Sequence, residues 1–212
     1  MVVSQTPSAA QRALQEIRQA IASGEIAPGS MVSEHDLAAR VGVSRTPVRT
    51  ALVRLQDEGW VTIYPQRGAL VRQIGPEESR HVMQARHAVE YASARSLPEA
   101  DRRALARTLA ALVDDQAEQL ARADLPRFVE VDVEFHRSFV VAGGNPVLLD
   151  FYDKLRARQV LLTARRAASG PNAERILQDH RRLAELVEHG DIETLDGALR
   201  EHLATAELSP QD

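Results

Sequence analysis

The sequence contains no cysteine and a single lysine, Lys154, and aromatic residues make up only 4% of its 212 residues. Without cysteine the chain can form neither a disulfide framework nor a zinc site built on thiolates. No signal peptide and no long apolar run is present, so we expect a soluble cytoplasmic protein without membrane attachment. Leu, Val and Ala supply most of the apolar residues, and this composition favours helices.

The charge is distributed unevenly along the chain. Residues 1–75 contain eight arginines against six acidic residues, whereas the remainder contains 18 basic and 24 acidic residues. Only the first part is therefore expected to meet nucleic acid. Because its net charge is only +2, tight binding would depend on a few well-placed arginines and on two copies acting together, and it would weaken as salt rises.

Residues 33–72 carry the signals of two short helices joined by a tight turn. Ser33 followed by Asp36 is a capping pattern, and Gly42 ends the helix that it starts. A second helix is predicted from Ser44, whose hydroxyl is expected to cap it, to about Glu58. This spacing is typical of a helix-turn-helix.

The second helix turns polar residues outward at its N-terminal end. Val48, Leu52 and Leu55 recur at three- and four-residue spacing and form its buried side. The outward residues are Arg45, Thr46, Arg49 and Thr50. Arginine can fork onto the O6 and N7 atoms of guanine, and threonine can reach a phosphate or a thymine methyl group. DNA binding is therefore the leading hypothesis for this part of the chain.

Two β-branched stretches at residues 60–64 and 69–74 follow, separated by turn residues 65–68. They predict a β-hairpin, which would complete a winged helix-turn-helix. Such a wing would place Gln66 and Arg67 beside the DNA.

These segments resemble the N-terminal domain of GntR-family transcription regulators. The resemblance rests on residues 24–30, 33–34, 36–38, 42–49, 51–52, 55 and 58–59. It implies DNA contacts by Arg45, Thr46 and Arg49 in the recognition helix and by Gln66, Arg67 and Gly68 in the wing. Thr50 departs from the glutamate that is usual in the family.

A domain boundary is predicted near Gly75–Pro76, which gives a DNA-binding domain over residues 1–75 and a second domain over 76–212. The second part has helical periodicity and no strand signals. Its predicted helices are 77–96, 99–123, 126–142, 146–168, 172–189 and 192–207. The expected fold is mainly α: a winged helix-turn-helix followed by an all-α bundle of about six helices.

Several polar residues of this second part fall inside apolar helix faces. At 100° per residue, Asp132 and His136 lie on the side of three phenylalanines, and His180 and His202 lie among leucines and alanines. An ionised carboxylate buried without a partner would cost several kcal/mol. A divalent metal would remove that cost, because it binds carboxylate and neutral imidazole together. Each histidine taken alone is a satisfied core residue more often than a ligand, but their joint placement favours a metal site.

These residues also resemble the FCD effector-binding domain of the FadR-like GntR subfamily. The resemblance rests on Asp132–His136, Asn145–Pro146, His180, Gly190–Asp191 and His202. It implies that Asp132, His136, His180 and His202 ligate an ion, most often zinc or nickel. Six helices rather than seven would correspond to the shorter FCD variant.

Arg86 shares the apolar side of its helix with Val82, Met83 and Val89. It could form a salt bridge with Glu90 one turn away, or its guanidinium could bind the carboxylate of a small organic acid. Regulators with FCD domains commonly sense such acids. The resemblance therefore favours Arg86 as an effector-binding residue.

The sequence predicts a regulator, most simply a repressor, that binds a palindromic operator as a homodimer and responds to a small organic acid. One alternative is a metal-sensing regulator without an organic effector. Another is a metal-dependent hydrolase, but Glu134 projects away from Asp132 and no Ser/His/Asp set or phosphate loop is present. We therefore expect no enzymatic activity.

Overall fold

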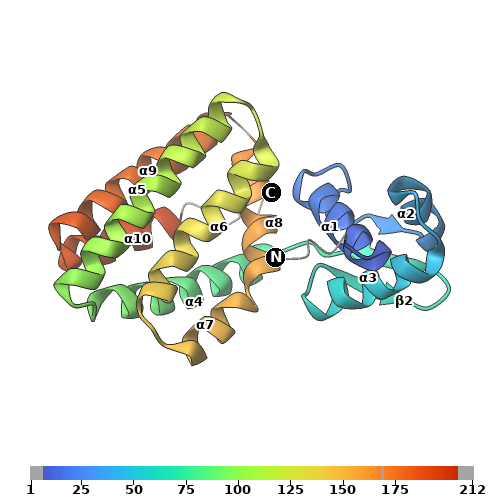
Figure 1. Cartoon of the computed structure of the whole chain (residues 1–212), viewed down its shortest axis with the longest axis horizontal. Helices are drawn as coiled ribbons and strands as arrows, with labels where there is room; N and C mark the ends of the chain where they lie inside the picture. The colour runs from blue at the N-terminus through green and yellow to red at the C-terminus, as the bar shows by residue number, and fades with distance from the viewer. Residues whose placement is uncertain (1–6, 169, 205–212) are drawn as a thin grey trace, which may run out of the picture. The chain divides into compact units, whose positions relative to one another are not determined.

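The computed structural model describes residues 7–168 and 170–204. Contacts divide the chain into two units, one ending at Gln73 and the other beginning at Ile74. The described residues are mainly helical, with one small antiparallel sheet in the first unit, as the predicted fold class requires (Figure 1). Within the described residues, no helix combines the length and the hydropathy that a membrane-spanning segment requires.

The first unit consists of three helices and three strands. The helices are α1 (Ala9–Ala22), α2 (Glu34–Val41) and α3 (Arg45–Asp57), and the strands are β1 (Met31–Val32), β2 (Val61–Tyr64) and β3 (Gly68–Val71). The strand order is β1-β3-β2, with both neighbouring pairs antiparallel. The hairpin of β2 and β3 is the predicted wing.

Local signals place the two helices of the helix-turn-helix. Ser33 caps α2 by accepting a hydrogen bond from the Asp36 amide at 3.0 Å, and Gly42 ends the helix with φ of 69°. Ser44 has the extended backbone of an N-cap, but its side chain makes no capping hydrogen bond, so that prediction is wrong. Ser44, Arg45 and Thr46 are all exposed, so the start of α3 lies at the surface.

Helix α1 and strand β1 were not predicted from the sequence. A capping box starts α1, in which Ser8 and Gln11 exchange backbone-to-side-chain hydrogen bonds of 2.7 and 3.2 Å. Ile17 and Ile21 on this helix are fully buried, and α1 packs against α3. The helix therefore completes the small core beneath the helix-turn-helix.

The second unit contains seven described helices rather than the six predicted. They are α4 (Pro76–Arg95), α5 (Glu99–Ala121), α6 (Leu125–Ala142), α7 (Pro146–Asp153), α8 (Arg156–Ala167), α9 (Gly170–His189) and α10 (Ile192–Ala204). The predicted helix 146–168 is divided at Lys154–Leu155, where no glycine or proline marks a break. Tertiary contacts explain the break, because Tyr152 is buried against α4 while α8 turns Gln159 and Thr163 inward. The predicted extension of the last helix to residue 207 lies outside the described residues.

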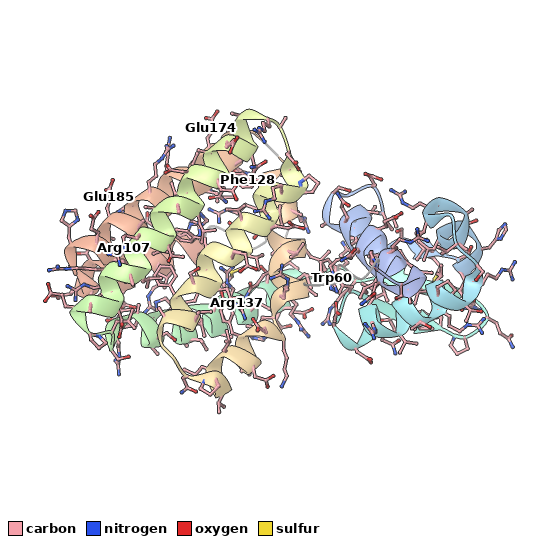
Figure 2. The ribbon with its side chains drawn as sticks, viewed as in Figure 1. Trp60, Arg107, Phe128, Arg137, Glu174 and Glu185 are labelled. Carbon is pink, nitrogen blue, oxygen red and sulfur yellow. The ribbon has the colours of Figure 1, made fainter. Side chains whose placement is uncertain are left out.

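Helix α6 is the centre of this unit and contacts α4, α5, α7 and α8. Its inner face carries Phe128, Phe135 and Phe139, each at most 1% exposed. Figure 2 shows charged residues such as Arg107 and Glu185 on the outward sides of neighbouring helices. The bundle therefore has an apolar interior in which a buried polar group stands out.

Candidate metal centre and nucleic-acid interface

Three histidines from three helices meet in the interior of the bundle. His136 lies on α6, His180 on α9 and His202 on α10, and none is more than 3% exposed. The His136 Nε2 atom lies 3.1 Å from the His202 Nε2 atom and 3.2 Å from the His180 Nε2 atom. The three histidine side chains therefore lie in the interior, as the helix projection predicted.

These separations fit ligands of one ion. Two nitrogens that each lie about 2.1 Å from a metal are about 3.0 Å apart at a right angle and about 3.4 Å apart at the tetrahedral angle. The observed distances of 3.1 and 3.2 Å fall between these limits. Among the described residues, these three histidines form a group whose possible ligand atoms all lie within 4.8 Å of one another.

The other nitrogen of each ring has its own partner. His136 Nδ1 lies 2.7 Å from Glu90 Oε2, His180 Nδ1 lies 2.7 Å from Gln116 Oε1, and His202 Nδ1 lies 3.0 Å from Asp179 Oδ2. All three partners are hydrogen-bond acceptors, so in each neutral ring Nδ1 carries the proton and donates it. Each Nε2 then presents a lone pair to the common centre, which is the arrangement that outer partners impose on metal-binding histidines.

Burial keeps the three rings neutral. Desolvation, followed by the positive charges of Arg86 and Arg166, lowers the pKa of His136 well below its ordinary value. The pKa values of His180 and His202 are also lowered well below their ordinary values, again with burial as the largest cause. Phe135 stacks on the His180 ring, with centroids 4.0 Å apart and planes inclined by 7°, and so fixes its orientation.

Asp132 lies beside this group, one helical turn from His136. Its Oδ1 atom is 3.6 Å from His180 Nε2, and its Oδ2 atom accepts a 2.9 Å hydrogen bond from the Thr163 hydroxyl. Burial raises the pKa of Asp132, whereas Arg86 and Arg166 act in the opposite direction. A cation among the histidines would stabilise the ionised carboxylate, so Asp132 can supply a fourth ligand, an oxygen beside three nitrogens.

Arg86 points into the same interior and is 2% exposed. Its Nε donates to Glu90 Oε1 at 3.0 Å, and the Tyr152 hydroxyl donates to the same oxygen at 2.5 Å. The salt bridge considered from the sequence is therefore present. It leaves Arg86 Nη2 buried without a hydrogen-bond partner, so a second role for the guanidinium stays open.

Sequence reasoning missed the outer partners of the histidines. Gln116 is fully buried in α5 and interrupts an apolar helix face, so the projection applied to the other helices could have found it. Glu90 was considered only as a partner of Arg86. Asp179 is 31% exposed at its side chain and gives no sequence signal of its own.

Five of the six predicted DNA-contacting residues line one groove of the first unit, and the sixth, Thr46, is not among the lining residues. Arg45, Thr46 and Arg49 are exposed in the first turns of α3, and Gln66 and Arg67 are exposed at the tip of the wing. A groove of about 580 Å³ lies between the two elements and is lined by Arg45, Arg49, Gln66, Arg67 and Gly68, together with Ser33, Glu34 and His35 of the α2 start. Ser33 was expected to cap α2, and no DNA contact was predicted for these three residues.

Within this groove Arg49 is paired with Glu34. Its Nε and Nη2 atoms donate to the two carboxylate oxygens at 2.9 and 2.8 Å. These hydrogen bonds hold the pKa of Glu34 below its usual value. The guanidinium nevertheless remains accessible, because the Arg49 side chain is 69% exposed.

Comparison with known proteins identifies both units. Residues 9–71 match the model of the gntR family of bacterial regulatory proteins, and residues 81–205 match the FCD domain. An HTH-type transcriptional regulator in an unstable DNA locus of Streptomyces ambofaciens is 32% identical over 195 residues, which cover 89% of this chain and 79% of that protein. The HTH-type transcriptional repressor RspR of Escherichia coli is 29% identical over 189 residues, 88% of this chain and 82% of the repressor.

The crystal structure of a transcriptional regulator GntR from a Rhodococcus species shares the fold, with a TM-score of 0.79 and 23% identity. The match covers 95% of this chain and 96% of that one. The relatives are transcription regulators, which excludes the hydrolase considered from the sequence. The chain therefore belongs to the gntR family of bacterial regulatory proteins, carries an FCD domain, and is a DNA-binding transcription regulator rather than an enzyme.

Proposed function

We propose that this regulator is a repressor whose operator affinity is set by a small organic acid bound at a divalent metal site in the FCD domain. Asp132, His136, His180 and His202 are the proposed ligands, and Arg86 is the proposed contact to the acid. Arg45, Thr46 and Arg49 of α3 and Gln66, Arg67 and Gly68 of the wing are the proposed DNA contacts.

The observation that carries the proposal is the convergence of three imidazole lone pairs. Because each Nδ1 donates to its own acceptor, the Nε2 atoms of the three rings are acceptors, and that of His136 lies 3.1 Å from that of His202 and 3.2 Å from that of His180. Three lone pairs turned toward one another in a buried site repel each other electrostatically. A cation at their centre turns this repulsion into attraction.

The donor set suits zinc or nickel. Imidazole nitrogen and carboxylate oxygen bind both ions, and the absence of thiolates permits six-coordinate geometry as well as tetrahedral geometry. When bound, the ion would supply positive charge and open coordination positions for oxygen atoms of a ligand. The chain's own groups would orient the rings through Glu90, Gln116 and Asp179.

Arg86 supports the acid part of the proposal. Its Nε donates to Glu90 and its Nη1 donates to the Met83 sulfur at 3.8 Å, but its Nη2 is buried without a hydrogen-bond partner. The outer edge of a guanidinium carries two parallel N–H donors, which match the two oxygens of a carboxylate. An acid seated there would satisfy the buried donors of Arg86.

Repression on a palindromic operator would need two copies of the weakly basic DNA-binding unit held together as a homodimer. The related RspR of Escherichia coli is a repressor, and other relatives are named repressors of sugar and gluconate operons. If the acid changes the separation of two DNA-binding units, acid and operator affect each other's binding by the same factor. Sedimentation would contradict the dimer if a monomer bound one half-site at full affinity.

Metal analysis of the purified full chain tests the centre directly. We expect about one zinc or nickel ion per chain by elemental analysis and native mass spectrometry. His180→Ala should lose this ion, whereas His189→Ala, which alters an exposed histidine on the same helix, should keep it. A metal-free wild-type protein that also fails to bind added zinc or nickel would refute the proposal.

Measurements of operator binding test whether an organic acid controls DNA affinity. DNA affinity should respond to one member of a panel of small carboxylic acids when metal is present, and a chelator should abolish the response. Arg86→Lys preserves the positive charge beside Glu90 but removes the two parallel N–H donors of the guanidinium. The response of DNA affinity to the acid should therefore weaken, while the metal content stays unchanged. Arg80→Lys, an exposed change on the same helix, is the matched control.

A second candidate is a regulator that senses the metal alone. It is favoured by Asp132, because Oδ1 lies 3.6 Å from His180 Nε2 and three histidines with one carboxylate can close a tetrahedral zinc site. Operator affinity that followed metal occupancy and ignored every acid would select this alternative.

A further inference from the structure

Glu34 and Arg49 join the two helices of the helix-turn-helix by a doubly hydrogen-bonded ion pair. Glu34 is the first residue of α2, and Arg49 lies in the second turn of α3. Arg49 Nε donates to Glu34 Oε1 at 2.9 Å, and Arg49 Nη2 donates to Glu34 Oε2 at 2.8 Å. The carboxylate therefore fixes the plane of the guanidinium as well as its position.

This contact uses only one side of the guanidinium. Arginine has five N–H donors, and the fork from Nε and Nη2 uses two of them. The donors that remain are on Nη1 and on the far side of Nη2, at the end of the side chain. Two adjacent donors at that end are what arginine uses to read guanine O6 and N7. Glu34 thus leaves free the edge of Arg49 that can read a base.

The surroundings of the pair place it where DNA would lie. Both residues line the groove between α3 and the wing, together with Arg45, Gln66 and Arg67. The Arg49 side chain is 69% exposed, whereas the Glu34 side chain is 28% exposed. An exposed ion pair contributes little to folding stability, so the pair needs another explanation. A carboxylate in this groove also repels phosphates, which disfavours a simple phosphate contact by Arg49.

We propose that Glu34 is a positioning residue for sequence recognition: it holds Arg49 with its terminal donors directed at a guanine in the major groove. This proposal rests on the assignment of α3 and the wing as the DNA interface. Its physical basis is preorganisation. An arginine already fixed in the free protein loses less conformational entropy when it meets the base, so specific binding is favoured over non-specific binding.

The test uses the full-length protein and a duplex that the wild type selects from a random-sequence pool, compared with unselected DNA of equal length. Glu34→Gln removes the charge and one of the two acceptors. We expect the ratio of specific to non-specific affinity to fall about three- to tenfold, the cost of ordering one side chain on binding. Affinity for unselected DNA should stay the same or rise, because a negative charge has left the interface.

Glu58→Gln is the matched control. Glu58 pairs with Arg18 at 2.5 Å and follows the C-terminal end of α3, so the same change in charge occurs away from the groove. The specificity ratio of this variant should equal that of the wild type. Thermal unfolding of both variants should match the wild type within a few degrees, which separates a binding effect from loss of fold.

Replacement of single guanines by 7-deazaguanine locates the contact. The wild type should lose affinity about fivefold or more at one guanine of each half-site, since the N7 acceptor is removed. With Glu34→Gln this penalty should shrink, because Arg49 no longer reaches the base in a fixed geometry. Equal penalties for wild type and variant would overturn the proposal.

The outcomes also distinguish a failure of the positioning role of Glu34 from a failure of the assigned DNA interface. If Arg49→Ala left specific binding unchanged, the assignment of Arg49 as a base contact would be wrong, and the proposal with it. If Arg49→Ala lowered the specificity ratio while Glu34→Gln did not, only the positioning role would be refuted. A Glu34→Gln variant that weakened binding to both DNAs equally would likewise refute it.

Discussion

Substitution of Glu90 by Gln tests whether the metal centre depends on its outer partners. Glu90 is fully buried and accepts from three donors: Arg86 Nε, the Tyr152 hydroxyl and His136 Nδ1. Burial raises the pKa of this carboxyl. The positive charge of Arg86 is the largest of the effects that lower it. Glutamine has one acceptor oxygen, and its NH₂ group must then face one of these donors.

These contacts allow the losses of folding stability and of metal affinity to be estimated. Breaking a buried ion pair by removing one partner costs about 3–5 kcal/mol, a large share of the roughly 5–15 kcal/mol by which a domain is stable. His136 also loses the acceptor that fixes its tautomer, and loss of such a partner lowers metal affinity about 10- to 100-fold. Tyr152→Phe removes a single hydrogen bond to the same carboxylate and should cost about 1.5–3 kcal/mol.

Urea unfolding of metal-free protein and competition with a chelator measure the two effects separately. Glu134→Gln provides the control, because Glu134 lies on α6 with His136 but forms a half-exposed ion pair with Arg156. It should change stability by less than about 1 kcal/mol and leave metal affinity unchanged. If Glu90→Gln bound metal as tightly as the wild type, the argument that its carboxylate orients His136 would be wrong.

Three further predictions concern the fold. Gly68→Ala should destabilise the first unit by at least about 1–3 kcal/mol in urea unfolding. A Cβ at this position would lie 2.1 Å from the Val32 carbonyl oxygen, and the backbone φ is +110°. Unchanged stability would mean that the wing is not paired with β1. Asn145→Ala should cost the second unit about 1 kcal/mol, since its side chain caps α7 by accepting from two amides, and an unchanged Tm would contradict this. The pKa of Asp115 lies below its usual value, and the hydrogen bond from the Gln119 amide is the largest cause. The ionised Asp115 therefore stabilises the folded state above about pH 4, and this stabilisation is lost as pH falls through the lowered pKa. The difference in Tm between wild type and Asp115→Asn should therefore shrink from pH 7 to pH 3, and a constant difference would refute the linkage.

The elements that could be predicted from the sequence are those with strong local signals. Ser33 and Gly42 mark the ends of α2, and the turn between β2 and β3 is evident from its composition. The break between α7 and α8 has no such signal at Lys154–Leu155, because it results from the contacts of the flanking side chains. Propensity and periodicity describe a helix by itself and cannot report such tertiary constraints.

The same distinction applies to the candidate centre. Helix projection found the three histidines, since a polar residue in an apolar face is visible in one helix at a time. The pairing of His180 with Gln116 and of His202 with Asp179 is not visible in this way, because each pair joins two different helices of the folded bundle. Sequence therefore indicates which groups need a partner, and the fold determines which partner each group has.

The charges of the interior give a physical reason for metal and acid to bind together. With Glu90 and Asp132 ionised, their two negative charges balance the positive charges of Arg86 and Arg166, and the three histidines are neutral. A divalent cation adds two positive charges to a low-dielectric interior, of which the partly exposed Asp179 offsets one at most. An anion beside the ion removes the remaining imbalance, and Arg86 supplies buried donors to hold it. Metal should therefore strengthen acid binding, and by reciprocity acid should slow the loss of metal to a chelator.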